Sequence, residues 1–268
     1  MNVSITDKTY KKLTIQVSLN GMSFCIFDAL SAQPLSLQNI QFEHFQKNTK
    51  IEDLFEKVFI EFPELNAAFD DILIIHNNNL STFVPNALFD NEFIGSYLQY
   101  NTKVFETDFF TYDELATFEM NNVYIPYINM NNYFIDKYGS FDYKHSSSIL
   151  VTKLLDVTKN IEDKKMFVHI TSTHFEIIIA QNQKLIFYNS FDYKTSEDFI
   201  YYILFTAEQL QLNPESFKLE LLGTISEEDN LYKIAYKYIR NTQLYTSEKN
   251  FNNINQAKQR EHIIRLNS

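Results

Sequence analysis

Two short polar segments, each placed between apolar runs, hold the residues best suited to bind a ligand. The first is Ser18-Leu19-Asn20-Gly21 and the second is Thr171-Ser172-Thr173-His174. The hydroxyls of Thr171, Ser172 and Thr173 can hydrogen-bond to a phosphate, although such residues are also common at plain hairpin tips, the interpretation we favour. Neither segment has a carboxylate, so Mg²⁺ would lack the hard anionic ligand it prefers. We therefore expect no catalytic residue and no metal site at these turns.

Three other groups of side chains are candidates for a reactive thiol, a metal site or an anion site. Cys25 lies in an apolar run, where we expect an inert buried thiol, because a reactive thiolate needs basic, partly exposed surroundings. His169, His174 and Glu176 make a three-ligand metal set conceivable, but strand alternation would put the imidazoles on opposite faces, which favours ordinary histidines. The segment His145-Ser146-Ser147-Ser148 stands at a strand-to-helix junction, where helix amides attract anions. Its simpler interpretation is a helix cap followed by a solvated face.

Composition and charge restrict the classes of function that are open to the chain. Its 268 residues carry 34 acidic and 23 basic side chains, a formal net charge of −11. Nucleic acids and anionic membranes need a clustered positive field, so we expect neither as a partner. The longest apolar segment, residues 199–207, is far shorter than the about 20 residues that span a bilayer. A single cysteine and a start without a secretion signal predict a cytoplasmic protein.

The polar segment 18–21 is expected to be the turn of a β-hairpin. Residues 13–19 alternate apolar and polar side chains, and Met22–Phe27 is apolar, which predicts two strands. They would join at Asn20-Gly21, a pair that tolerates the positive φ of a tight turn. A third strand is expected at Pro34–Phe42.

A helix, a strand and a second helix are expected next. A capping box at Thr49 and Glu52 would start the first helix, and Pro63 would end it. Ile72–Ile75 predicts a strand buried within a parallel arrangement. Apolar spacing over residues 85–98 predicts an amphipathic helix. The following region is expected to hold, in order, a strand, a helix, a strand, a helix capped by Ser146 or Ser147, and a polar connection: Val123–Ile128, Asn132–Tyr138, Phe141–His145, 146–157 and 160–165.

The second half of the chain repeats the first with an ungapped offset at its start. Residues 13–28 align with 166–181, which places Ile15 on Val168 and Phe24 on Ile177. A third strand at Leu185–Tyr188, a helix with a capping box at Thr195 and Asp198, and a strand at Phe217–Leu222 follow in the same order. A last helix is expected after Ser226–Asp229, and His262–Leu266 is expected to return as an edge strand or to fray.

This order of strand, strand, strand, helix, strand, helix, seen twice, is typical of the two ribonuclease-H-like halves of an actin-like protein. Together with Thr82–Phe89 and Val123–Pro126, the layout resembles the bacterial domain-of-unknown-function 3822 family. Members of that family look like actin-type ATPases related to cytoplasmic scaffold proteins of pilus assembly and type II secretion. The resemblance implies an α/β actin-like ATPase fold with mixed sheets and helices on both faces. We divide it into a first lobe (1–122), a crossover segment shared between lobes (123–165) and a second lobe (166–268).

The resemblance also implies where a nucleotide would lie. In active actin-like ATPases each hairpin turn carries an Asp and a Gly for magnesium and phosphate, and a Gly pair in the second lobe receives adenosine. The matching positions here are Asn20 and Gly21, Thr171–Thr173, and Gly223, so the motifs are degenerate. We expect a non-catalytic scaffold or interaction protein with a protein partner or self-association and no required cofactor. The alternative is an ATP-binding switch or weak ATPase that uses the inter-lobe cleft with ATP and magnesium.

Overall fold

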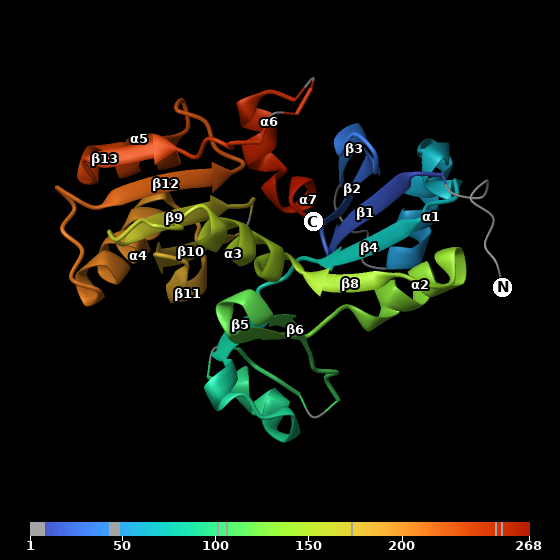
Figure 1. Ribbon diagram of the computed structural model, residues 1–268, viewed down its shortest axis with the longest axis horizontal. Helices are drawn as coiled ribbons and strands as arrows, with labels where there is room; N and C mark the ends of the chain where they lie inside the picture. The colour runs from blue at the N-terminus through green and yellow to red at the C-terminus, as the bar shows by residue number, and fades with distance from the viewer. Residues whose placement is uncertain are drawn as a thin grey trace.

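Two five-stranded sheets and a smaller three-stranded sheet form the framework of the described part of the chain (Figure 1). The computed structural model describes residues 9–42, 49–100, 102–105, 107–172, 174–249, 251–252 and 254–268. Helices cover both faces of the large sheets, as the sequence predicts for an α/β protein. None of the helices within these ranges has the length and apolarity needed to cross a membrane.

The first lobe is built on the sheet with strand order β3-β2-β1-β4-β8, which takes β8 from the segment 123–165 that was expected to be shared between the lobes. Strands β1, β2 and β3 are antiparallel, whereas β4 runs parallel to both β1 and β8. Their apolar faces pack against helices α1 and α2, with Phe55, Phe59 and Phe134 in the core. The predicted position of β4 between parallel neighbours is confirmed, and Ile74 and Ile75 are buried, whereas Ile72 and Leu73 are only partly buried. The elements are β1 (Lys11–Ser18), β2 (Gly21–Asp28), β3 (Gln33–Gln41), α1 (Ile51–Glu61), η2 (Pro63–Asn66), β4 (Asp71–His76), α2 (Ile128–Tyr138) and β8 (Asp142–His145).

The second lobe is built on the sheet with strand order β11-β10-β9-β12-β13. Helices α4 and α5 cover one face of this sheet, and α3 packs on the other against Phe167, Ile178 and Leu222. Helix α3 therefore lies between the lobes (Figure 1). The elements are α3 (Ser146–Asp156), β9 (Lys165–Ile170), β10 (His174–Gln181), β11 (Lys184–Asp192), α4 (Ser196–Gln209), β12 (Lys218–Gly223), α5 (Asn230–Tyr238) and β13 (Asn241–Leu244).

The two large sheets share both strand order and register. Ile15 lies opposite Phe24 across the first hairpin, and Val168 lies opposite Ile177 across the second. The ungapped alignment of residues 13–28 with 166–181 therefore pairs structurally equivalent positions. The two hairpin turns consequently occupy the same place in their lobes.

The small sheet corrects the expected helix over residues 85–98. Strands β5 (Ser81–Pro85), β7 (Met120–Tyr124) and β6 (Thr111–Leu115) form it, in the order β5-β7-β6. After β5 the chain forms short 3-10 turns, η3 (Asn86–Leu88) and η4 (Asn91–Tyr97), and η5 (Ala116–Phe118) precedes β7. The side chain of Asp90 accepts a bond from the Glu92 amide, and Phe93 has non-helical dihedrals, so no continuous helix forms.

The C-terminal segment corrects a second expectation, because His262–Leu266 is neither an edge strand nor frayed. Helices α6 (Gln256–Glu261) and α7 (Ile263–Leu266) lie between the lobes near the C-terminus of the chain (Figure 1). Ile263 and Ile264 are buried in the same apolar cluster as α3, while α7 also contacts β1 and β2. The segment thus joins both lobes over the cleft.

Helix capping was predicted correctly at one site and wrongly at others. Thr195 accepts from the Asp198 amide and Asp198 from the Thr195 amide, the expected capping box. By contrast, α1 begins after Lys50 with no side-chain cap, so Thr49 and Glu52 form no box. Asp229 precedes α5 without capping it through its side chain.

Candidate functional site

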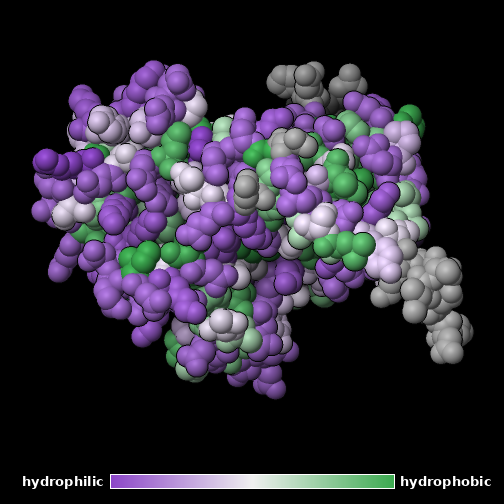
Figure 2. All heavy atoms as spheres, turned by 45° about the horizontal axis from the view of Figure 1, so that its top comes forward, coloured by the Kyte–Doolittle hydropathy of each residue, from purple (hydrophilic) through white to green (hydrophobic). Residues whose placement is uncertain are grey.

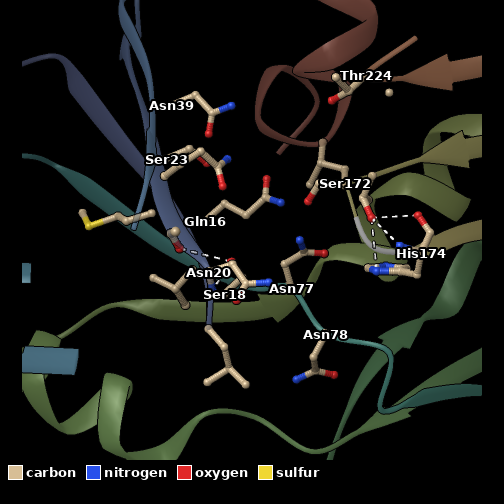
Figure 3. Close-up of a pocket in the computed structure, with 18 of the residues that line it drawn as sticks. Gln16, Ser18, Asn20, Ser23, Asn39, Asn77, Asn78, Ser172, His174 and Thr224 are labelled. Atoms are coloured by element: carbon tan, nitrogen blue, oxygen red, sulfur yellow. Dashed lines mark hydrogen bonds between the residues drawn. The ribbon is translucent and has the colours of Figure 1, made fainter. Parts of the chain in front are cut away.

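A cavity of about 380 Å³ lies between the lobes, where the two hairpin turns face each other (Figure 3). Asn20 and Gly21 line it from the first lobe, and Thr171, Ser172 and Gly223 line it from the second. Thr173, the remaining predicted position, lies outside the described residues. The structure thus brings the described candidate residues together, while their contact with a nucleotide stays a prediction.

The first turn differs in detail from the expected geometry. Leu19 and Asn20 form the loop, Ser18 pairs with Gly21, and neither Asn20 nor Gly21 is among the described residues with positive φ. Gly21 is needed for another reason: a Cβ atom there would lie 2.5 Å from the carbonyl oxygen of Ile40 on β3. The glycine therefore permits close approach of neighbouring strands.

The second turn uses its threonine hydroxyl internally. The Thr171 hydroxyl donates to the His174 carbonyl at 2.7 Å and accepts from the His174 amide at 3.2 Å. The Tyr193 hydroxyl donates to the Thr171 carbonyl at 3.0 Å. The Thr171 hydroxyl thus stabilises the turn, as expected for a polar hairpin tip.

Gly223 is fixed by backbone crowding as well. Its φ is +91°, and a Cβ atom there would lie 2.1 Å from the carbonyl oxygen of Ile170 on β9. No side chain larger than hydrogen fits that approach. Gly223 and the adjacent Thr224 nevertheless form part of the cavity wall.

Several cavity residues were missed because they sit within or just after strands. The polar face of β1 to β3 contributes Gln16, Ser23, Asn39 and Gln41, and the loop after β4 contributes Asn77, Asn78 and Asn79. The triple asparagine was a usable signal, because side chains after parallel strands gather at the same sheet edge.

The C-terminal helices add two charges to the cavity. Arg265 on α7 is buried and donates to the Gln16 amide oxygen at 2.9 Å and the Ser23 hydroxyl at 2.6 Å. Burial lowers the pKa of Arg265 to about 10. Asn39 donates to a carboxylate oxygen of Glu261 at 3.5 Å. Arg265 was missed because residues 262–266 were expected to form an edge strand or to fray.

The cavity does not fit the magnesium nucleotide that the resemblance implies. Among the described lining residues the carboxylates are Asp192 and Glu261, on β11 and α6, and neither belongs to a hairpin turn. No lysine is among these lining residues. Magnesium binding with substrate phosphates uses one or two convergent carboxylates, which the turns do not supply.

The conceivable metal set forms a buried hydrogen-bonded pair instead. His169 lies opposite Glu176 across the hairpin, and His174 lies on the same face, so the expectation of opposite faces was wrong. The Glu176 carboxylate lies 2.8 Å from His169 Nδ1 and accepts from the Tyr188 hydroxyl at 2.7 Å. Burial raises the pKa of Glu176, but these contacts outweigh burial and lower it to about 2. No group of three or more metal-binding side chains is placed for a metal in the described chain.

The cluster at residues 145–148 is buried, so the expected solvated face was wrong. His145 is the N-cap of α3, and its Nδ1 accepts from the Ser147 amide at 3.2 Å. Asn122 donates to the hydroxyls of Ser147 at 2.9 Å and Ser148 at 2.8 Å. The cap of α3 is therefore His145, not Ser146 or Ser147 as expected, and the cluster is a polar core joining β7, β8 and α3.

Cys25 is fully buried in a small apolar cluster with Phe251 and Leu266. Burial raises the pKa of its thiol to about 12, which keeps the sulfur protonated. This agrees with an inert thiol.

A family model described as "Protein of unknown function (DUF3822)" matches residues 1–242. No curated protein matches the chain. A solved protein of Bacteroides thetaiotaomicron VPI-5482, described as having an actin-like ATPase fold and unknown function, is similar, with 22% identity and a TM-score of 0.80. That match covers 91% of this chain and 93% of the other.

Two further solved structures are similar over nearly their whole length. The PilM-PilN type IV pilus biogenesis complex matches with 10% identity, a TM-score of 0.56 and coverage of 95% of this chain and 96% of the other. The cytoplasmic domain of EpsL, an inner membrane component of the type II secretion system of Vibrio cholerae, matches with 11% identity and a TM-score of 0.50, covering 96% and 95%. At these identities the likeness shows the fold alone, which is the actin-like ATPase fold.

Proposed function

Because this chain belongs to the family described as "Protein of unknown function (DUF3822)", we propose that it is a non-catalytic actin-like protein that acts in the cytoplasm by binding proteins, including itself. The observation that carries the proposal is the chemistry of the two turns. They face one cavity, yet they present amide and hydroxyl groups where metal-assisted phosphoryl transfer needs carboxylates.

The buried acid nearest the second turn is not available for catalysis. Glu176 is 4% exposed and its two carboxylate oxygens contact His169 and Tyr188. Asp192 is paired across the strands with His174, and Glu261 comes from α6 on the other side of the cavity. This arrangement offers no evident base beside the position of a nucleotide's terminal phosphate.

We expect the purified chain to show no magnesium-dependent ATP hydrolysis, because the turns lack magnesium ligands. Phosphate release would be measured with ATP and Mg²⁺, in parallel with the variant Thr171→Ala and with the surface variant Ser196→Ala as a matched control. Magnesium-dependent turnover that Thr171→Ala abolishes and Ser196→Ala leaves intact would overturn the proposal of a non-catalytic protein.

The outer face of the second lobe supports self-association. Tyr201 and Phe205 stack on α4 at 6.0 Å, and Tyr232 and Tyr236 stack on the neighbouring α5 at 6.0 Å. Tyr201 is 59% exposed and Tyr236 is 62% exposed. Exposed aromatic residues on two adjacent helices are typical of protein interfaces.

The charges of these helices favour a second copy of this chain as the occupant. Helix α4 carries Glu197, Asp198 and Glu208 without a basic residue, whereas α5 carries Lys233 and Lys237 without an acidic one. A twofold arrangement that sets α4 of one copy against α5 of the other joins opposite charges around the aromatic residues. The PilM-PilN and EpsL structures, described as a complex and as a component of a secretion system, agree with a role in assembly.

We expect the chain to dimerise through this face. The double variant Tyr201→Ser/Tyr236→Ser should weaken association about tenfold or more, since aromatic residues dominate interface energies. Sedimentation velocity over a concentration series measures this, and Leu30→Ser/Ile60→Ser, which alters exposed apolar residues elsewhere, serves as the control. Equal effects of the two double variants would contradict the assignment to the α4–α5 face.

A nucleotide-binding switch or weak ATPase is the second candidate, favoured by the open cavity at the predicted position. Asn20, Ser172 and Thr224 expose polar groups there. Calorimetry with ATP, with and without Mg²⁺, separates the two candidates, because the switch requires saturable ATP binding in the cavity.

A further inference from the structure

The side chains around the inter-lobe cavity are mainly uncharged groups that both donate and accept hydrogen bonds. Carboxamides and aliphatic hydroxyls make up almost half of the lining residues, and they come from both lobes. Such groups suit a ligand whose own groups also donate and accept.

Two carboxamides of the first lobe are oriented by hydrogen bonds from neighbouring side chains. The oxygen of Gln16 accepts from Arg265, and the oxygen of Asn77 accepts from the Ser146 hydroxyl at 3.0 Å. Each NH₂ group therefore remains to donate. Both residues lie at the cavity in Figure 3. Gln16 is on β1, and Asn77 directly follows the parallel neighbour β4. The first lobe thus presents two pre-oriented hydrogen-bond donors to the cavity.

The second lobe contributes side chains to the cavity that make no hydrogen bond within the described part of the protein. Asp192 on β11, Ser172 in the second turn and Thr224 after β12 make no side-chain hydrogen bond within the described residues, and neither does Asn79 across the cavity. An ionised carboxylate only accepts hydrogen bonds, so Asp192 can contact a ligand only through a donor on that ligand. A ligand that bridges Gln16 or Asn77 and Asp192 must accept from the first lobe and donate to the second, as hydroxyl groups do.

The charges of the cavity disfavour an anion. Asp192 and Glu261 are acidic, and the single described arginine of the lining is only 5% exposed, with its donors directed to Gln16, Ser23 and His262. Phosphate groups are normally held by accessible basic side chains or by magnesium. The volume of about 380 Å³ is within the usual range for a small-molecule site.

From these observations we propose that the inter-lobe cavity binds an uncharged polyhydroxyl ligand, a carbohydrate of one or two rings, held between the carboxamides of the first lobe and Asp192, Ser172 and Thr224 of the second. This site goes beyond the proposed function and does not depend on it. ATP turnover would overturn the proposed function, whereas the sugar titrations decide this proposal.

The test is isothermal titration of the full chain with glucose, N-acetylglucosamine and cellobiose, alongside ATP and inorganic phosphate. We expect saturable binding of at least one sugar, little dependence on salt concentration, and no competition by phosphate. The double variant Asn79→Ala/Asp192→Ala should weaken sugar binding about tenfold or more, because it removes two hydrogen-bonding groups. The variant Asn230→Ala/Asp163→Ala, which makes equivalent changes at exposed positions away from the cavity, should leave the affinity unchanged.

Three results would overturn the proposal. The first is that no sugar binds up to its solubility limit, with circular dichroism showing folded protein. The second is that ATP or phosphate binds and sugars do not, which assigns the cavity to an anion. The third is that sugar binding persists in Asn79→Ala/Asp192→Ala, which places the site elsewhere.

Discussion

Replacing Gly223 with alanine should lower the free energy of unfolding by about 3 kcal/mol or more, which is a large fraction of a domain's stability. Two costs add at this position. The φ of +91° is strained for any residue with a Cβ atom, and that atom would lie 2.1 Å from the Ile170 carbonyl oxygen. Because the obstacle is backbone of the parallel neighbour β9, the strands themselves must separate.

Gly139 supplies a matched control for Gly223. Its φ is +79°, but a Cβ atom there would meet nothing within 4 Å. Gly139→Ala should therefore cost only the backbone strain, about 1 kcal/mol. Urea denaturation of the two variants measures the difference between their free energies of unfolding, which is the contribution of the close approach between β12 and β9. Equal losses of stability would show that the approach of β12 to β9 imposes no requirement for glycine.

Much of the fold could be predicted because its strands are amphipathic or wholly apolar. The alternation over residues 13–19 and the apolar run at 175–180 predicted the two hairpins. The constant offset between residues 13–28 and 166–181 predicted that the hairpins have the same register. Thr195 and Asp198 located the start of α4 because their capping geometry is local. Such signals depend on a few neighbouring residues and do not need the rest of the chain.

The errors arise where distant contacts decide the conformation. Residues 262–266 are apolar enough for a strand, yet they form α7 because Ile263 and Ile264 are buried against α3. Residues 86–97 have helical spacing, but Asp90 and Phe93 interrupt the backbone pattern. The prediction that His169 and His174 lie on opposite faces was wrong because strand alternation does not continue through a hairpin turn. The turn between them places both side chains on the same face of the sheet.

The site was predicted in part for the same reason. Turn residues such as Asn20 and Ser172 stand out in sequence, and the repeat implies that they face each other. Gln16 and Arg265 do not stand out, because their roles depend on a contact between positions 16 and 265. Gly21 and Gly223 also permit close approach of neighbouring strands, and that role cannot be seen in the sequence because it depends on distant backbone atoms.

The protein should lose stability steeply as the pH falls from 7 to 5, because two buried histidines are locked in the neutral form. Nδ1 of His76 accepts from the Tyr127 amide at 3.1 Å, and Nδ1 of His145 accepts from the Ser147 amide at 3.2 Å. Their Nε2 atoms face the amide oxygens of Asn131 and Asn78. A second proton on either ring would displace an amide donor, which leaves a buried N–H unsatisfied.

The sign follows from the pKa values of the two states. Burial lowers the pKa of His76 to about 4 and that of His145 to about 3, against about 6.5 in the unfolded chain. Between these values the unfolded state binds more protons, so stability is complete above about pH 6.5 and declines below it. Each histidine should contribute a loss of about 2 kcal/mol between pH 7 and pH 5, or about 4 kcal/mol together.

Unfolding free energies measured in urea at pH 7, 6 and 5 test this expectation. His262, whose pKa burial also lowers to about 3, acts in the same direction, whereas Asp113, whose pKa burial raises, acts in the opposite one. The variant His76→Gln can still accept from the Tyr127 amide and donate to Asn131, so it should reduce the pH slope without abolishing folding. A slope unchanged in both His76→Gln and His145→Gln would show that these rings are protonated in the folded protein, contrary to the hydrogen bonds that hold them.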